Sequence, residues 1–297
     1  MNYNLRLSSH RKEEPEERVL YIVSTPIGNL EDISIRAINI LKKVSLIACE
    51  DTRITGRLLN NYEISNKTIS FHKFNYQEKI PYLISMLKNG ASIALVSDAG
   101  TPLISDPGEL LVSEIKRKDL DVIAIPGACA ALSALVCSGL PTSKFSFYGF
   151  LPRKGKERRV YLESISNNIF SSIVYESPKR INKLLIDLKF YCKGDREISL
   201  SKELTKKYEQ TIFTTIDETL KSIKNNEMKG EFTIIIRGID ERKEGDNDLE
   251  IKKDLLHLIN AGLSHTAASN FLAKKTGKSK KYIYQLILNN EFNSGSN

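Results

Sequence analysis

The sequence lacks the patterns that mark most metal-binding, disulfide-bonded and membrane proteins. Its 297 residues include four cysteines with no Cys-x-x-Cys pair and four histidines with no ligand-like spacing. We therefore expect reduced, buried thiols and no metal. No apolar run reaches the roughly 18 residues that span a bilayer, and residues 1–18 hold no apolar signal-peptide core. These absences predict a cytoplasmic protein with no membrane partner.

The common nucleotide-binding signatures are missing as well. No two glycines are spaced as Gly-x-Gly, which excludes the dinucleotide fingerprint and the glycine loop of common Rossmann methyltransferases. Gly277-Lys278-Ser279 imitates the end of a P-loop, but Leu272 occupies the upstream glycine position. No order of serine, aspartate and histidine indicates a hydrolase.

One unusual stretch, residues 96–108, reads Val-Ser-Asp-Ala-Gly-Thr-Pro-Leu-Ile-Ser-Asp-Pro-Gly. It follows the apolar run 92–96 and precedes a helical period that starts at Leu110. Strand, structured turn and helix in this order place a loop at the carboxyl end of a strand, where α/β proteins contact ligands. Glycine permits close backbone approach and proline stiffens the loop. The alternative is an ordinary connection between a strand and a helix.

Apolar periodicity along the chain predicts two α/β domains followed by a small helical module. Strands and helices alternate first, which implies a mainly parallel sheet. Residues 151–159 are expected to form a polar, basic connector. The predicted division is a disordered lead-in (1–18), an N-terminal α/β domain (19–142), a second α/β domain (143–240), a charged linker (241–249), a helical tail (250–290) and a disordered end (291–297).

The chain carries a net charge of +8, and two basic stretches concentrate part of it. Clusters of lysine and arginine bind phosphates without reading sequence, so these stretches favour an RNA partner. The alternative is an ordinary solvated surface. The candidate RNA-binding residues are Arg153, Lys154, Lys156, Arg158, Arg159, Lys274, Lys275, Lys278, Lys280 and Lys281.

Six strings occur in one order: residues 25–30, 49–53, 97–108, 125–127, 175–178 and 202–206. Together they resemble the tetrapyrrole-methylase superfamily over about residues 19–238. Within it they are similar to the branch that methylates the 2′-oxygen of a cytidine in 16S ribosomal RNA. The chain departs from the family pattern at peripheral positions: Ala128 replaces a common proline, Lys179 a frequent histidine and Lys202 an arginine.

The resemblance implies two α/β domains with S-adenosylmethionine in the cleft between them, a homodimer, and the 16S RNA of the small ribosomal subunit as substrate. Ordinary packing is the alternative for Cys129 and Tyr175. Carried over to this sequence, the implied cofactor-binding residues are Pro26, Ile27, Gly28, Asp98, Gly100, Thr101, Ala128, Cys129, Ala130 and Tyr175.

Methyl transfer depends mostly on positioning, and a general base adds to it. Glu50 and Asp51 are the candidates for a base or an orienting group, and Arg53 for a phosphate contact. The alternative is a helix N-cap with an ion pair. Two other functions stay open: a methylase of small tetrapyrroles, and a ribosome-assembly factor that binds RNA without catalysis.

Overall fold

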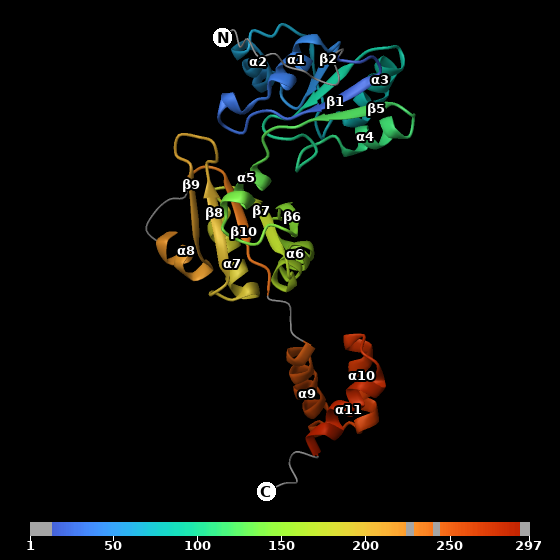
Figure 1. The fold of residues 1–297 in the computed structure, drawn as a ribbon, viewed down its shortest axis with the longest axis vertical. Coiled ribbons are helices and arrows are strands. Elements are labelled where there is room, and N and C mark those ends of the chain that lie inside the picture. The colour runs from blue at the N-terminus through green and yellow to red at the C-terminus, as the bar shows by residue number, and fades with distance from the viewer. Residues whose placement is uncertain (1–13, 224–228, 240–243, 292–297) are drawn as a thin grey trace. The chain divides into compact units, whose positions relative to one another are not determined.

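The computed structural model describes residues 14–223, 229–239 and 244–291 (Figure 1). It divides into two compact units, Met1–Gly238 and Ile239–Asn297. The first unit contains two five-stranded sheets, and the second is helical. In the described part of the chain, no helix is both long and apolar enough to cross a membrane.

The first sheet has the strand order β3-β2-β4-β1-β5, and every pair in it is parallel. This confirms the predicted parallel sheet. Because all five strands run the same way, their carboxyl ends meet at one edge, which is where the candidate site residues lie. The strands are β1 (Val19–Val23), β2 (Leu46–Cys49), β3 (Thr68–Ser70), β4 (Ile93–Val96) and β5 (Asp121–Ile125).

Helices cover both faces of this sheet (Figure 1). One face packs on α1 and α2 through Ile40 and Leu59, and the other on α3 and α4 through Leu83 and Leu111. Apolar residues on both faces explain why β1, β2 and β4 are buried along their whole length. The elements are the 3₁₀ turn η1 (Leu30–Asp32), α1 (Ile35–Lys43), α2 (Thr52–Asn61), α3 (Tyr76–Lys88) and α4 (Glu109–Lys116).

The second sheet is mixed, with the order β6-β7-β10-β8-β9. Only β6 and β7 pair in parallel, and the other neighbours are antiparallel. Helices α6, α7 and α8 pack against this sheet through one apolar core. The elements are β6 (Phe145–Phe150), α6 (Gly155–Asn167), β7 (Ser171–Glu176), α7 (Ile181–Cys192), β8 (Glu197–Lys202), β9 (Gln210–Thr215), α8 (Ile216–Ile223) and β10 (Phe232–Ile236).

Two elements differ from the sequence prediction. Helix α5 (Ala130–Cys137) was expected in the N-terminal domain, but it packs on the second sheet, with Ala134 and Leu135 against Ile173 and Ile235. The predicted connector at 151–159 is in part helix, since α6 begins at residue 155. The first turns of α6 are mostly charged in sequence, and its buried apolar residues, Leu162 and Ile165, come only later in the helix.

Three expected boundaries change. Residues 14–18 were predicted as part of a disordered lead-in, yet Glu14 pairs with Arg36 and the Glu16 N–H donates to the Tyr21 hydroxyl at 2.7 Å. Residues 244–249 were predicted as linker, but they belong to α9 (Glu244–Asn260). Helix α11 includes Glu291, the first residue of the expected disordered end. Residues 1–13, 240–243 and 292–297, on which the rest of these predictions falls, lie outside the described residues.

The second unit contains α9, α10 (His265–Thr276) and α11 (Lys280–Glu291). The Ser264 side chain caps α10 by accepting from the Ala267 N–H, and Gly277, at φ +71°, ends it. The three helices share a small apolar core of Ile251, Leu255, Ala268, Leu272, Ile283 and Leu286.

All four cysteines are free. Cys49 and Cys192 are buried, as predicted. The prediction of a buried thiol is wrong for Cys137, which is exposed, and Cys129 is only half-buried.

Candidate active site

Three loops at the carboxyl edge of the first sheet are hydrogen-bonded to one another. The Thr25 N–H donates to the Gly100 carbonyl at 2.9 Å, and the Gly100 N–H donates back to Thr25 at 3.0 Å. The Thr101 hydroxyl donates to the Ala128 carbonyl at 3.0 Å and lies 2.9 Å from the Ser24 hydroxyl. The loops after β1, β4 and β5, which carry most of the predicted cofactor residues, therefore form one connected surface.

Glycine is required at two points of this surface. Gly100 has φ +81°, a backbone conformation that residues with a Cβ rarely adopt. A Cβ added at Gly127 would lie 2.8 Å from the Ser24 Cβ, so a larger residue would push the β1 and β5 loops apart. The loops are held at a backbone separation that only glycine permits.

The β1 loop also contacts the turn that follows β8 in the second sheet. A Cβ on Gly28 would lie 2.5 Å from Lys206 Cγ and 2.7 Å from Thr205 Oγ1. The neighbouring Asn29 N–H donates to Thr205 Oγ1 at 3.0 Å. Lys206 is itself fixed by an ion pair with Glu203 at 3.0 Å. The string at 202–206 thus supports the predicted cofactor loop at residues 26–28.

Tyr175 stands on β7 and reaches the start of α5. Its hydroxyl accepts a hydrogen bond from the Ala131 N–H at 3.0 Å. Burial raises the pKa of Tyr175, which keeps the phenol neutral. Its ring lies 5.2 Å from the Phe147 ring and 5.5 Å from the Phe150 ring. With these contacts Tyr175 packs against two aromatic rings and binds the first turn of α5. A role toward the cofactor stays a prediction.

Asp98 ties the β4 loop to the β2 loop. Its Oδ1 accepts from the Asp51 N–H at 3.1 Å. Burial raises the pKa of Asp98, although this hydrogen bond opposes the shift. The half-buried carboxyl lies two residues before Gly100, in the β4 loop of the connected surface.

Asp51 caps α2 and pairs with Arg53. Its Oδ1 accepts from the Arg53 N–H at 2.8 Å, and its Oδ2 lies 2.6 Å from Arg53 Nη2. These bonds to Arg53 hold the pKa of Asp51 well below its ordinary range. This is the N-cap and ion pair that the sequence left as the alternative. A carboxylate with so little proton affinity is a poor general base.

Two further carboxyls at this edge have raised pKa values. Burial, together with Asp98, raises the pKa of Glu50, while His72 and Lys73 oppose the shift. Asp106 lies in the stretch 96–108 but is not among the site residues predicted from the sequence. Burial and the charge of Glu50 raise its pKa to about 6. The signal available in the sequence was the presence of a second carboxylate in residues 96–108.

The family model described as Tetrapyrrole (Corrin/Porphyrin) Methylases matches residues 19–220. The chain belongs to this family. Ribosomal RNA small subunit methyltransferase I of Halalkalibacterium halodurans is 42% identical over 93% of this chain and 96% of its own. The protein of the same name from Vibrio cholerae is 47% identical over 74% of this chain and 77% of its own.

A solved structure of low sequence identity shares the fold. It is the uroporphyrin-III C-methyl transferase of Thermus thermophilus in complex with S-adenyl homocysteine, with a TM-score of 0.52 at 17% identity. The match covers 73% of this chain and 96% of that one. The predicted family resemblance, the two-domain α/β fold and the methyltransferase class are confirmed.

The first basic stretch of this family member contains one residue that is not a surface residue. Arg158 is 4% exposed, and it donates from Nε to Asp187 Oδ2 and from Nη1 to the Pro152 carbonyl, both at 2.8 Å. Its prediction as an RNA-binding residue is wrong, because the buried guanidinium is already paired with Asp187 and bonded to the Pro152 carbonyl. The exposed members of the stretch are Arg153, Lys154, Lys156 and Arg159.

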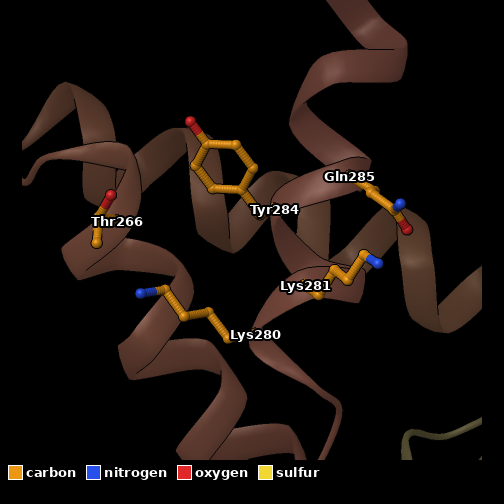
Figure 2. A pocket seen from close by; sticks show the side chains of 5 residues that line it. All are labelled: Thr266, Lys280, Lys281, Tyr284 and Gln285. Carbon is orange, nitrogen blue, oxygen red and sulfur yellow. The ribbon is translucent and has the colours of Figure 1, made fainter.

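The second basic stretch surrounds the junction of α10 and α11. Lys275 forms an ion pair with Asp254 at 2.7 Å, and Lys278 lies 4.8 Å from the centre of the Tyr282 ring. Lys274 is exposed. A pocket of about 500 Å³ lies beside this junction. Figure 2 shows the side chains around it. It is lined by Thr266, Lys280, Lys281, Tyr284 and Gln285.

The carboxyl edge also carries an exposed pair that the sequence analysis missed. Phe74 is 83% exposed, and Lys73 Nζ lies 4.9 Å from the centre of its ring. The charge of Lys73 lowers the pKa of Glu50, so Lys73 and Phe74 lie near the acidic groups of the site. Among the described residues, no three His, Cys, Asp or Glu side chains form a group that could hold a metal ion.

Proposed function

We propose that this chain is an S-adenosylmethionine-dependent methyltransferase of the ribose 2′-oxygen of a cytidine in the 16S RNA of the small ribosomal subunit. The observation that carries the proposal is the similarity to ribosomal RNA small subunit methyltransferase I over 93% of the chain. A match of that extent includes both sheets and the helical unit, not the shared methylase fold alone.

The connected loops fit the cofactor. The positive φ of Gly100 and the close approach at Gly127 bring three loops together at the edge of the sheet, where backbone groups of strand ends suit a zwitterionic amino acid. S-adenosylmethionine, when bound, supplies a methyl group activated by a sulfonium. Pro26, Ile27 and Gly28 flank it, Asp98, Gly100 and Thr101 contact it, and Ala128, Cys129, Ala130 and Tyr175 line the remaining side.

The β2 loop serves the RNA side of the reaction. Glu50 orients the ribose hydroxyl, and Arg53, whose side chain is 84% exposed, contacts a phosphate. Asp51 fixes the start of α2 and holds the Arg53 guanidinium in place. Orientation of the acceptor oxygen supplies much of the acceleration in such a transfer.

The exposed cations of both basic stretches bind RNA phosphates, and Phe74 offers a face for an unpaired base. In the first unit these cations are Arg153, Lys154, Lys156 and Arg159. In the second unit they are Lys274, Lys275, Lys280 and Lys281, and the half-buried Lys278 lies beside them. An RNA substrate of this kind places the protein in the cytoplasm.

An exposed apolar area supports a homodimer. On α5, Leu132 is 50% and Val136 72% exposed, and on the edge strand β9 Phe213 is 54% exposed. A Cβ on Gly139, just after α5, would lie 3.8 Å from Phe213 Cδ2, which brings the two elements together. Apolar side chains gathered in this way mark a surface that a second copy covers.

The test is transfer of a radiolabelled methyl group to purified ribosomal subunits. Small subunits are isolated from cells without the gene for this protein, and large subunits serve as the matched control. The proposal expects label in 16S RNA and none in 23S RNA. No label in 16S RNA, from protein that binds S-adenosylhomocysteine, would contradict the proposed substrate.

A further inference from the structure

The loop between β6 and α6, residues 151–154, starts beside the candidate site. We call it the basic loop. It directly follows Gly149 and Phe150, the last two residues of β6. A Cβ on Gly149 would lie 2.7 Å from Ser105 Oγ, in the loop after β4. Phe150 pairs in register with Tyr175 of β7, and their ring centres are 5.5 Å apart. The basic loop therefore begins where the second sheet contacts the connected loops of the candidate site.

Two arginine side chains bind consecutive carbonyls of the basic loop. Arg180, just before α7, donates from Nη2 to the Leu151 carbonyl at 2.6 Å. Arg158, on α6, donates from Nη1 to the Pro152 carbonyl at 2.8 Å. The Leu151 side chain is 1% exposed, so it anchors the same end of the loop in the apolar core. The start of the loop is thus fixed from two helices and from the core.

Each of these arginines is held by a carboxylate on its other side. Arg180 Nε lies 3.2 Å from Glu176 Oε1, and the side chain of Glu176 is fully buried at the end of β7. Arg158 Nε donates to Asp187 Oδ2 of α7 at 2.8 Å. A guanidinium presents several N–H donors in one rigid plane, so it can bond a carboxylate and a carbonyl at the same time. A lysine ammonium carries its charge at one point and does not reproduce this geometry.

The cations of the basic loop point to the use of this support. Arg153 and Lys154 directly follow the two bound carbonyls, and both are exposed. Arginine and lysine bind phosphate oxygens by charge-assisted hydrogen bonds. Ordering a loop on binding costs free energy, and a backbone that is already fixed avoids that cost. A supported loop therefore binds phosphates more tightly than a free loop with the same two charges.

We propose that Arg158 and Arg180 are positioning residues, which hold the basic loop so that Arg153 and Lys154 bind phosphates of the RNA strand that enters the candidate site. The inference rests on the proposed methyltransferase function. The guanidinium groups of Arg158 and Arg180 are occupied by carboxylates and carbonyls of the second sheet domain, so both act on the RNA through the exposed cations.

The experiment uses the full chain and substitutions that keep the charge of each positioning residue. The variants are Arg158→Lys, Arg180→Lys, the double variant Arg153→Gln/Lys154→Gln, and a triple variant that adds Arg180→Lys to the double one. Lys183→Gln, at an exposed position in α7, controls for the loss of a surface charge. Filter binding to small subunits is measured between about 50 and 200 mM salt, without cofactor. Calorimetry with S-adenosylhomocysteine and urea unfolding are measured on the same proteins.

The double variant should lower the slope of log affinity against log salt by roughly 1.4–1.8, because each lost phosphate contact removes about 0.7–0.9. Arg158→Lys and Arg180→Lys should each lose part of the same slope, although the net charge is unchanged. The triple variant should bind like the double variant, since Arg180 acts through cations that are already gone. In the lysine variants the Michaelis constant for small subunits should rise while turnover and S-adenosylhomocysteine affinity are kept. Lys183→Gln should match the unmodified chain.

Three results would overturn the inference. The first is an unchanged salt slope in both lysine variants, and the second is an unchanged slope in the double variant, which would show that the basic loop does not bind RNA. The third is a triple variant whose loss is the sum of the separate losses, because Arg180 would then act elsewhere. Urea unfolding identifies a lysine variant that does not fold, and the other arginine then decides. Methyl transfer by the unmodified chain tests the proposed function separately, because the salt slope is measured without cofactor.

Discussion

The Oδ1 atom of Asp98 accepts a hydrogen bond from the backbone N–H of Asp51 at 3.1 Å. This bond joins the loop after β4 to the loop after β2, so the group predicted to contact the cofactor also positions the start of α2. Asp51, in turn, holds Arg53. A change at Asp98 should therefore affect both the loop that we propose binds the cofactor and the residue that we propose contacts RNA.

Asp98→Asn and Asp98→Ala separate these two effects. Asparagine keeps an oxygen that accepts from Asp51 but removes the charge, and alanine removes both. We expect each variant to weaken S-adenosylhomocysteine binding by at least about tenfold, because a hydrogen bond to a charged group is worth roughly 1.5–3 kcal/mol. Only alanine should also lower the melting temperature. Calorimetry tests this, with Asp121→Asn at the start of β5 as the control. Unchanged affinity in both variants would remove Asp98 from the cofactor site.

Arg158 and Arg159 are neighbours with opposite expected roles. Arg158→Ala leaves the Asp187 carboxylate and the Pro152 carbonyl without their partner, so we expect a loss of about 2–4 kcal/mol in the free energy of unfolding. Arg159→Ala, on the exposed side of α6, should stay within about 0.5 kcal/mol of the unmodified chain and weaken RNA binding. Urea unfolding and filter binding measure the two effects. The assignment of Arg158 to the protein interior fails if both variants unfold alike.

Gly28→Ala tests the contact between the β1 loop and the turn after β8. The new methyl group would lie 2.5 Å from Lys206 Cγ and 2.7 Å from Thr205 Oγ1, so the loop must move. We expect weaker S-adenosylhomocysteine binding and a lower melting temperature. Gly56→Ala in the interior of α2 has no atom within 4 Å and should gain roughly 0.5–1 kcal/mol in the free energy of unfolding. Equal behaviour of the two variants in calorimetry and thermal unfolding would show that the Gly28 contact is not needed.

The charge of Asp106 should lower the stability of the folded chain at neutral pH. Its pKa in the folded chain is raised to about 6 from 3.8, so its contribution to stability is present below pH 3.8 and is lost as pH rises toward 6. Asp106→Asn removes this loss. Allowing for solvent screening, we expect the variant to be more stable by on the order of 1 kcal/mol at pH 7.5 and by less at pH 4.5. Urea unfolding at both pH values measures the difference. A variant that is destabilised equally at both would argue for a structural hydrogen bond as the main role of Asp106.

The sequence alone predicted the elements of the first sheet well. Apolar runs such as residues 19–23 and 93–96 are short and bounded by turn residues, and they are strands in the structure. The loop at residues 96–108 was identified because its glycines and prolines are dense. The N-cap role of Asp51 could be stated only as an alternative, since a helix start and a catalytic carboxylate look the same in sequence.

Tertiary contacts explain what the sequence did not reveal. Helix α5 follows the first sheet in the chain, and nothing local shows that Ala134 and Leu135 pack on β7 and β10 instead. The basic residues before Leu162 obscured α6, and Arg158 looked like its neighbours until Asp187 was brought beside it. The raised pKa of Asp106 arises from its burial and then from the charge of Glu50, more than fifty positions away. Such effects depend on long-range packing, which periodicity does not report.

The most direct test of the whole account is the chemical identity of the methylated nucleoside. Small subunits from cells without the gene are incubated with this protein and S-adenosylmethionine, and the 16S RNA is digested to nucleosides and analysed by mass spectrometry. We predict one additional 2′-O-methylcytidine per subunit, seen also as a site resistant to alkaline hydrolysis. A methyl group on a cytosine base, on another nucleoside, or on no nucleoside at all would contradict the account.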